Sequence, residues 1–412
     1  MIFCAALSIG AQSPLGLTYP LGAPDLAVSG VSAAMGNGGT AVVDEYMGTS
    51  VNPANAAVGG RSVFSALISY DITNIGDNGA SATVSGYMPK LLSLIIPAGR
   101  AGNLGFSMQR RYDANLNFYT ANTRTIDEWT SNAATVEIRR TGGLTAWQAG
   151  WAYRFGNGVG LGLIYERLFF NLNSRNVFES TLSYNAGDGQ PKQYQTVVID
   201  SVIAAFASNG LRFGMQIPVH EKVTLGFAGE YAFTGGGAET GGRRYDRDPI
   251  PNGYSKSFSV ALPPSMSIGA AYKLDDHWLF AADAHSVWWE YYENDSKTGG
   301  AERCFGLSLG ARHIPAANIL SAKYWEKINY GAGVRYATLP NNKEDSDRAS
   351  EYALSAGAGL PIPRDGGMVD IVISFGRRSD PKYRNYEENI VKLQLGLNGG
   401  RNWFQKDASR EY

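Results

Sequence analysis

A stretch of small residues stands ahead of a long array of alternating segments, and this order most constrains the fold. Residues 33–57 read AAMGNGGTAVVDEYMGTSVNPANAA. The stretch does not alternate like a strand, and its glycines and proline argue against one regular helix. Almost all of the sequence after it alternates with period two. We therefore expect a compact segment folded inside, or against the mouth of, a large β-barrel.

Period-two alternation recurs along the chain, with turn signals between the segments. Leu104, Phe106 and Met108, for example, alternate with small or polar residues. Strands are expected at 64–70, 104–108, 149–155, 159–165, 211–217, 223–233, 266–272, 278–292, 328–336, 352–360, 369–375 and 391–397. The regions 81–97, 134–140 and 195–206 allow two or more further strands.

The composition favours a membrane barrel over a secreted soluble β-sandwich. Charged residues make up 18% of the chain, against roughly 25% in soluble domains. The face opposite the bulky apolar residues is often Gly, Ala or Ser, and Tyr and Trp stand near strand ends, where interfacial girdles lie. Because lipid has no water to satisfy an open sheet edge, such an array must close on itself. We predict an all-β fold, a transmembrane antiparallel barrel.

The connections between the expected strands differ in length. Longer polar connections are expected at 171–195, 234–256, 295–303 and 341–348, and tight turns at 219–222, 274–277 and 364–367. Long loops at one end and short turns at the other are typical of outer-membrane barrels.

The first residues are similar to the end of a secretory signal. Residues 2–9 are apolar, and Ile9-Gly10-Ala11 is similar to a cleavage site, although no positive region precedes them. We expect residues 1–11 to be a truncated signal peptide, with a buried first strand as the alternative. Cys4 would leave with the signal, so that Cys304 would have no disulfide partner.

Several function classes are disfavoured. The net charge of −1 gives no indication of a nucleic-acid surface, and no run approaches the roughly 18 apolar residues of a spanning helix. The four histidines lack metal-binding spacing. The GLSLG sequence at 306–310 lies in an alternating strand, whereas a nucleophilic Ser308 would need a strand–turn–helix context. We predict no enzyme activity, no cofactor and no metal.

Two segments carry a family resemblance. The first runs from Gly36 through Asp44 to Asn52-Pro53-Ala54, and the second comprises Leu262-Pro263, Gly269, Tyr272, Trp278, Asp283 and Trp288. Their order resembles the long-chain fatty acid transporter (FadL-type) superfamily of outer-membrane barrels. Residues 395–406 are similar to the last strand and tail of such proteins in Bacteroidetes-like bacteria. Asn55 is a departure, because many relatives have Gly after Asn-Pro-Ala.

The resemblance implies a fourteen-stranded barrel in the outer membrane of a Gram-negative-type cell. Residues 12–58 would form a hatch in the lumen, residues 59–404 the barrel and residues 405–412 a tail. The implied function is passive uptake of hydrophobic small molecules such as long-chain fatty acids, which leave sideways near a kinked third strand, expected near residues 102–112. The expected partners are outer-membrane lipid and the ligand, and the barrel is expected to be monomeric.

The candidate site residues fall in two groups. The first group lies in the hatch, and its members either contact a ligand or only shape the hatch. They are Met35, Gly36, Asn37, Asp44, Asn52, Pro53 and Ala54. The alternation also predicts lumen-facing polar side chains at Arg212, Lys273, Asp283, His285 and Arg335. A carboxylate ligand could pair with Arg212, Lys273 or Arg335, but a generic water-filled lumen gives the same set.

Two alternative functions stay open at this point. Related fourteen-stranded barrels in Bacteroidetes-like bacteria are carriers or subunits of a protein secretion system (PorV-like), and they share the Gly-rich start and the Asn-Pro-Ala. That alternative implies a protein partner. A general diffusion porin would instead show a steady open conductance for hydrophilic solutes.

Overall fold

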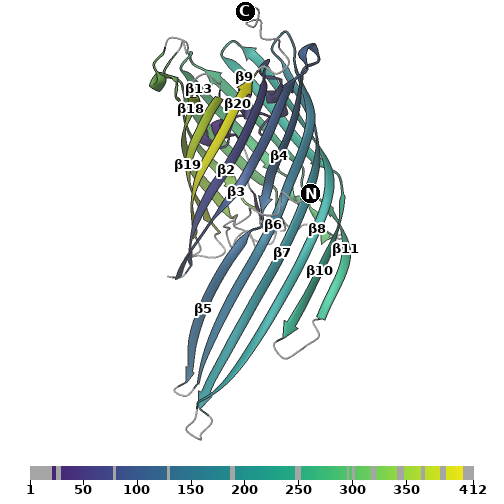
Figure 1. The fold of residues 1–412 in the computed structure, drawn as a ribbon, viewed down its shortest axis with the longest axis vertical. Coiled ribbons are helices and arrows are strands. Elements are labelled where there is room, and N and C mark those ends of the chain that lie inside the picture. The colour runs from purple at the N-terminus through teal and green to yellow at the C-terminus, as the bar shows by residue number, and fades with distance from the viewer. Residues whose placement is uncertain are drawn as a thin grey trace, which may run out of the picture.

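Fourteen antiparallel strands close into a barrel in the computed structural model (Figure 1). The structure describes residues 21–24, 29–77, 80–127, 130–185, 191–245, 252–294, 297–298, 302–316, 322–340, 348–362, 367–380 and 387–401. In ring order the strands are β2 (Ser62–Asp77), β3 (Ala80–Pro97), β4 (Asn103–Asp113), β6 (Thr130–Arg154), β7 (Gly160–Asn185), β8 (Pro191–His220), β9 (Val223–Ala232), β12 (Ser265–Lys273), β13 (Trp278–Val287), β16 (Cys304–His313), β17 (Asn329–Thr338), β18 (Ser350–Ile362), β19 (Gly367–Ser379) and β20 (Glu387–Arg401). Pairing of β20 with β2, from Ser62↔Arg401 to Gly76↔Glu387, closes the ring.

The outer face of the barrel is apolar. Leu163, Phe213, Leu307, Leu309 and Leu354 are each more than half exposed. In a closed sheet every strand has a partner on both sides, which is the condition for strands to cross lipid. An apolar band around such a barrel is the lipid-facing surface of a transmembrane protein. The predicted all-β transmembrane barrel is therefore confirmed.

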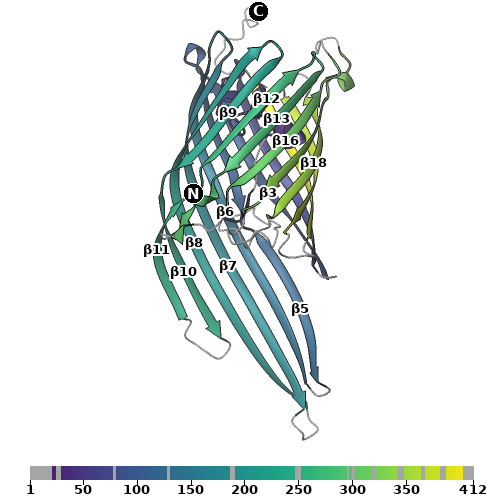
Figure 2. The same ribbon diagram turned by 180° about the vertical axis from the view of Figure 1, so that it is seen from behind.

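Part of the sheet continues beyond the barrel at the end opposite the short turns (Figures 1 and 2). The strands β6, β7 and β8 have 25, 26 and 30 residues, whereas a tilted membrane crossing needs about 9–11. β5 (Leu116–Asp127) pairs with the first half of β6, and β10 (Gly235–Tyr245) pairs with β8 and with β11 (Asn252–Ala261). We call these continuing segments the extracellular extension, because short turns mark the periplasmic end.

The extension corrects the expectation of polar loops at 171–195 and 234–256. All described residues in these two ranges lie in strands, except residue 234, which belongs to the turn at 233–234. The expected strand at 278–292 also ends earlier, because β13 stops at Val287 and is followed by η5 (Trp289–Tyr291), β14 (Glu293–Asn294) and β15 (Lys297–Thr298). The short elements η4 (Gly99–Ala101) and η6 (Tyr324–Lys327) lie in periplasmic connections.

The third barrel strand is interrupted, and the sheet splits beside it. β4 shifts register between Arg110 and Tyr112 and ends at Asp113, two residues before β5 begins. β3 pairs with β4 only from Leu91↔Gln109 to Pro97↔Asn103, while the rest of β3 pairs with β2 alone among the described residues. The register shift lies within residues 102–112, where the family resemblance implies a kinked strand. Among the described residues, β3 has no ladder hydrogen bonds to β4 beyond Gln109 and none to β5.

A small hydrogen-bond network fixes the kink. The Asp113 carboxylate accepts from Arg110 Nη2 at 3.1 Å and from the Asn115 backbone at 3.1 Å. The Asn115 side chain in turn accepts from the Gly142 N–H at 2.9 Å. These bonds join the end of β4 to β6 and satisfy groups that the sheet ladder leaves without partners.

The N-terminal segment fills the barrel lumen. It contains β1 (Ala23–Pro24), α1 (Gly30–Ala34), η2 (Glu45–Met47) and η3 (Pro53–Ala57). α1 packs against β17 to β20, and η3 packs against β4, β6, β7 and β8. We call residues 29–58 the hatch. Among the described residues, no helix is long and apolar enough to cross a membrane.

Candidate functional site

Wall glycines create the space that the hatch occupies. A Cβ atom on Gly214 would lie 2.0 Å from Asn52 Oδ1, and one on Gly226 would lie 2.2 Å from the Thr40 carbonyl oxygen. A Cβ atom on Gly333 would likewise lie 2.2 Å from the backbone of Met35. The small inward residues of the strand pattern therefore let hatch backbone lie directly against the wall.

Asn52 joins the hatch to two wall strands. Its Nδ2 donates to the carbonyl oxygens of Thr40 at 2.7 Å, Met215 at 3.1 Å and Phe227 at 3.2 Å. Its Oδ1 accepts from the Ala54 N–H at 3.0 Å and so caps η3, in which Pro53 takes the first position. The Asn-Pro-Ala sequence thus both starts a helical turn and fastens it to β8 and β9.

Two carboxylates hold the other parts of the hatch. Asp283 on β13 accepts from the backbone N–H groups of Gly39 and Thr40, the latter at 3.2 Å. Asp44 caps η2 by accepting from the Tyr46 N–H at 2.8 Å, and its second oxygen pairs with Arg312 on β16 at 2.5 Å. The hatch is therefore bonded to strands on several sides of the barrel.

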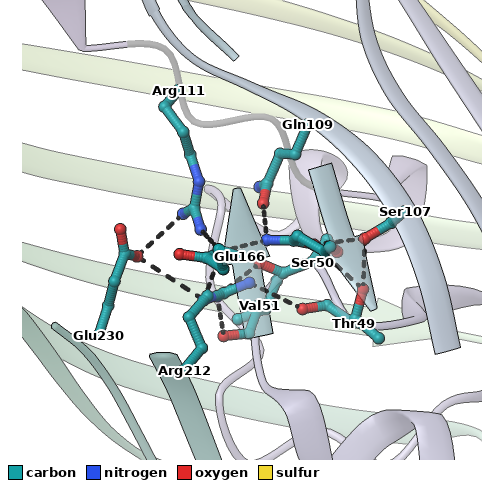
Figure 3. Close-up of polar contacts among 10 residues, drawn as sticks. Thr49, Ser50, Val51, Ser107, Gln109, Arg111, Glu166, Arg212 and Glu230 are labelled. Atoms are coloured by element: carbon teal, nitrogen blue, oxygen red, sulfur yellow. Dashed lines mark hydrogen bonds and ion pairs between the residues drawn. The ribbon is translucent and has the colours of Figure 1, made fainter. Parts of the chain in front are cut away.

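A buried charge cluster lies where the hatch meets β4 and β6 to β9 (Figure 3). Arg111 pairs with Glu166 at 2.6 Å and with Glu230 at 3.1 Å. Arg212 lies 3.8 Å from Glu166 and 3.7 Å from Glu230, and it donates at 3.1 Å to the hatch carbonyl oxygen of Thr49. Two cations face two carboxylates, so the cluster is balanced, which a buried group of charges requires.

Neutral polar side chains extend this cluster toward β4. Gln148 donates to Glu166 at 2.5 Å and to Gln109 at 3.3 Å. Ser107 donates to Gln148 and lies 2.9 Å from the hydroxyl of Thr49. Glu166 is fully buried. These residues form a layer of polar side chains beside the hatch.

An apolar cluster lies on the extracellular side of this polar layer. It contains Leu21, Leu144, Ala146, Leu168, Phe170, Phe206, Ala232, Phe258, Val260, Leu262, Trp289, Tyr292 and Cys304, with Tyr112, Leu172 and Val287 packed against it. Glu166 lies closer to the periplasmic end of β7 than Leu168 does, and Arg212 lies closer to that end of β8 than Phe206 does. The cluster thus fills the outer part of the lumen beside the kink.

The structure places the predicted hatch residues at the wall. Met35, Asn52 and Ala54 are fully buried, and Pro53 is buried as well. Gly36 donates to Ser355 on β18 at 2.9 Å. Asn37 has a positive φ of 62° and lines a small cavity at the wall. The ligand role of these residues stays a prediction.

The predicted lumen residues divide between different places. Arg212 lies in the charge cluster, Asp283 holds the hatch, and the ring of His285 fills the space above Gly306. Arg335 lines a cavity. Lys273 lies at the periplasmic rim, where its side chain is 55% exposed and pairs with Asp276 at 2.8 Å, so it does not extend into the lumen.

Sequence reasoning missed Arg111 and Glu166, the partners of Arg212 and Glu230. The alternation of β7 could have indicated Glu166, because this charged residue takes the next inward position after Ile164, at membrane depth. A charge at such a position needs a partner. Arg111 lies within the register shift of β4, where alternation no longer tells the direction of a side chain.

Comparison with solved structures identifies the fold. Over 93% of the chain the structure is similar to all of the CymD monoaromatic hydrocarbon channel (TM-score 0.58, 16% identity) and all of the toluene transporter TodX of P. putida (TM-score 0.59, 14% identity). It is also similar to a Pseudomonas aeruginosa FadL homologue (TM-score 0.60, 13% identity, 91% of this chain and 98% of that one). The fold is that of FadL-type outer-membrane channels, which are transport proteins, not enzymes.

The sequence itself defines the family. The sequence profile named BamG matches residues 2–408. The chain therefore belongs to the BamG family. A search of curated protein sequences found no match.

Proposed function

We propose that the protein is a channel for hydrophobic small molecules, such as long-chain fatty acids, that enter from the extracellular side and leave sideways into the membrane. The observation that carries the proposal is the split between β3 and β4 beside the apolar cluster. Tyr112 lies on the split edge of β4, and its ring meets that of Trp289 with centroids 5.6 Å apart. Apolar side chains thus extend from the lumen to the opening.

The polar layer favours a sideways route over a straight one. A hydrophobic molecule that moved toward the periplasm would have to displace the Arg111–Glu166 and Arg212 contacts and then the hatch. Breaking a buried ion pair costs about 3–5 kcal/mol. The opening beside Tyr112 lies before this layer, so a ligand that leaves there avoids that cost.

The segment Leu21–Pro24 lies along the edge of β4 at the split. Ala23 pairs with Asp113 and Pro24 with Tyr112 on the β4 edge. Gly22 has φ of +90°, and a Cβ atom there would lie 2.2 Å from the Asp113 carbonyl oxygen, so the fit is tight. We propose that this segment moves aside when the ligand leaves.

A bulky substitution in the apolar cluster tests the route. Ala146 is fully buried in the cluster, whereas Ala149 on the same strand is exposed on the outer face. Ala146→Trp should abolish oleate uptake by cells without another fatty acid channel, and Ala149→Trp should leave it intact. Heat-modifiable mobility checks that both variants fold. Normal uptake by a folded Ala146→Trp variant would refute the route.

Deletion of residues 12–57 tests the hatch separately. If the hatch blocks free diffusion, its removal should raise the permeability of proteoliposomes to small hydrophilic solutes in a swelling assay. Unchanged permeability would rule out its role as a plug and would favour a porin whose conductance does not depend on the hatch.

A second candidate function is that of an accessory barrel that binds a protein partner, such as a secretion-system component. The extracellular extension favours it, because its outer ends, away from Phe258 and Val260 of the apolar cluster, are not needed for the proposed route. Tyr119, Tyr184, Tyr194, Tyr245 and Tyr254 are each at least 38% exposed on it, and tyrosine is enriched at protein interfaces. Co-purification of a large partner that is lost when Tyr119, Tyr184 and Tyr194 are replaced with serine would support this function, and loss of fatty acid uptake from the same substitutions would contradict it.

A further inference from the structure

The periplasmic connection between β16 and β17 is longer than its neighbours. It spans residues 314–328, whereas the connections of β6 to β7, β8 to β9 and β12 to β13 span residues 155–159, 221–222 and 274–277. Outer-membrane barrels have short turns at the periplasmic end. The added length of this one connection therefore asks for a purpose beyond joining two strands.

The helical turn η6 in this connection presents two aromatic side chains. Trp325 is 72% exposed and Tyr324 is 41% exposed. Their rings meet edge to face, with centroids 5.6 Å apart. Such side chains stabilise a structure chiefly through the apolar area that they bury. In water, most of the Trp325 side chain would contribute nothing of this kind.

Hydrogen bonds hold the turn in place on the barrel. The Lys323 N–H donates to Glu326 Oε2 at 3.0 Å and so caps η6. The Ala316 N–H donates to the Glu326 carbonyl oxygen at 2.9 Å, and the Ile314 N–H donates to the His277 carbonyl oxygen at 2.9 Å. η6 also packs against β18. The aromatic pair is thus carried by a turn that is bonded to the rim.

The turn lies outside the ring of strands. Figures 1 and 2 show it as a short green coil that projects sideways from the barrel, level with the periplasmic strand ends. β17 begins at Asn329, two residues after η6 ends. A side chain that projects sideways at this level meets the membrane interface, whereas one directed along the barrel axis would meet the lumen or the periplasm.

An aromatic row on the outer face leads directly to this turn. Trp278 pairs with His313, and His313 pairs with Tyr330, across β13, β16 and β17. The rings of Trp278 and His313 lie 4.3 Å apart, and Trp278 and Tyr330 are 39% and 43% exposed. Because Trp and Tyr gather where hydrocarbon meets water, this row marks the periplasmic edge of the lipid-facing surface. η6 continues that surface.

We propose that η6 is a lipid anchor, in which Tyr324 and Trp325 insert among the phospholipid headgroups of the periplasmic leaflet. An indole ring combines an apolar body with one N–H donor, so it is stabilised at that depth. Lys323 and Lys327 stand on either side of the pair and bind lipid phosphates, to which lysines near a membrane surface are attracted. The anchor lies across the ring from the split between β3 and β4, so it is independent of the proposed route.

Photo-cross-linking in intact cells identifies what covers the turn. The photoreactive p-benzoylphenylalanine, placed at Trp325, should form an adduct of phospholipid mass that phospholipase cleaves. The same amino acid at Tyr194, which is 51% exposed on the extracellular extension, should form none. A cross-link from Trp325 to another protein, with no phospholipid adduct, would overturn the proposal.

Fluorescence in vesicles of phosphatidylcholine and phosphatidylglycerol tests the depth independently. The Trp325 emission is the difference between the unmodified full chain and Trp325→Phe. Lipid brominated near the headgroup should quench it about twofold more than lipid brominated at the chain ends. Trp289, 1% exposed inside the barrel, is the control, because the emission lost in Trp289→Phe should respond to neither lipid.

The lysines are tested by the same measurement. Replacing Lys323 and Lys327 together with glutamine should reduce the quenching of Trp325 by brominated lipid severalfold. Unchanged quenching would refute the phosphate contact. Trp325 emission that brominated lipid leaves intact and aqueous iodide quenches would refute the anchor itself.

Discussion

Replacing Asn52 with alanine should loosen the hatch without disturbing the barrel wall. The carboxamide has two N–H hydrogens, so it makes at most two full donor bonds among its three carbonyl neighbours, and it accepts one bond from Ala54. Three buried hydrogen bonds at about 1 kcal/mol each give about 3 kcal/mol. Because Thr40 and Ala54 lie within the hatch, this loss applies to local unfolding of the hatch, whose equilibrium constant should rise on the order of a hundredfold.

Hydrogen–deuterium exchange measures this loss directly. Amides in residues 29–58 of Asn52→Ala should exchange on the order of a hundredfold faster, while peptides from β16 to β20 keep the rates of the unmodified protein. Asn157→Ala is the matched control, because Asn157 also caps a turn, accepting from the Val159 N–H at 3.1 Å, but it is exposed and does not touch the hatch. Unchanged hatch exchange, or equal acceleration in the wall, would refute the reasoning.

Three further perturbations have defined outcomes. Gly214→Val should prevent hatch docking, since even a Cβ atom would lie 2.0 Å from Asn52 Oδ1, and the protease sensitivity of the hatch would report this. Glu166→Gln leaves Arg111 with Glu230 as its one remaining carboxylate partner in the cluster. It should lower the free energy of unfolding, measured by denaturant titration, by about 3 kcal/mol. An unchanged free energy of unfolding would mean that the cluster is solvated. The Asp275 carboxylate accepts from two backbone N–H groups at 2.8 Å, which holds its pKa below the ordinary 3.8. The ionised Asp275 carboxylate therefore stabilises the turn above pH 3.8, and this stabilisation is lost as the pH falls through the lower pKa of the folded protein. A titration midpoint at or above pH 3.8 in the carbon chemical shift of Asp275 would contradict this prediction.

The alternation of the sequence predicted the barrel because lipid and lumen impose opposite demands on the two faces of each strand. It also placed Arg212, Asp283 and Arg335 on the inward face. The kink near residues 102–112 was predictable only through the family resemblance, since its cause is a network that joins Asp113 and Asn115 to Gly142.

The extracellular extension could not be predicted by the same reasoning. Residues 171–184 present polar side chains to water on much of both faces, so no apolar stripe marks them as a strand. They are a strand because β6 and β8 pair with them along their whole length. Such pairing is a property of distant segments, and so is the contact of Arg111 with Glu166.

The wall glycines have a consequence for how this chain can change over evolutionary time. Gly214 admits the side chain of Asn52 and the backbone of Pro53, Gly226 admits the backbone at Thr40, and Gly333 admits that at Met35. A larger residue at any of these wall positions requires a compensating shift or deletion in the hatch, more than 160 residues away in the sequence in each case. Substitutions in the hatch and at these glycines should therefore covary among related sequences, and a relative whose inward positions are large should have lost the internal segment that this chain keeps.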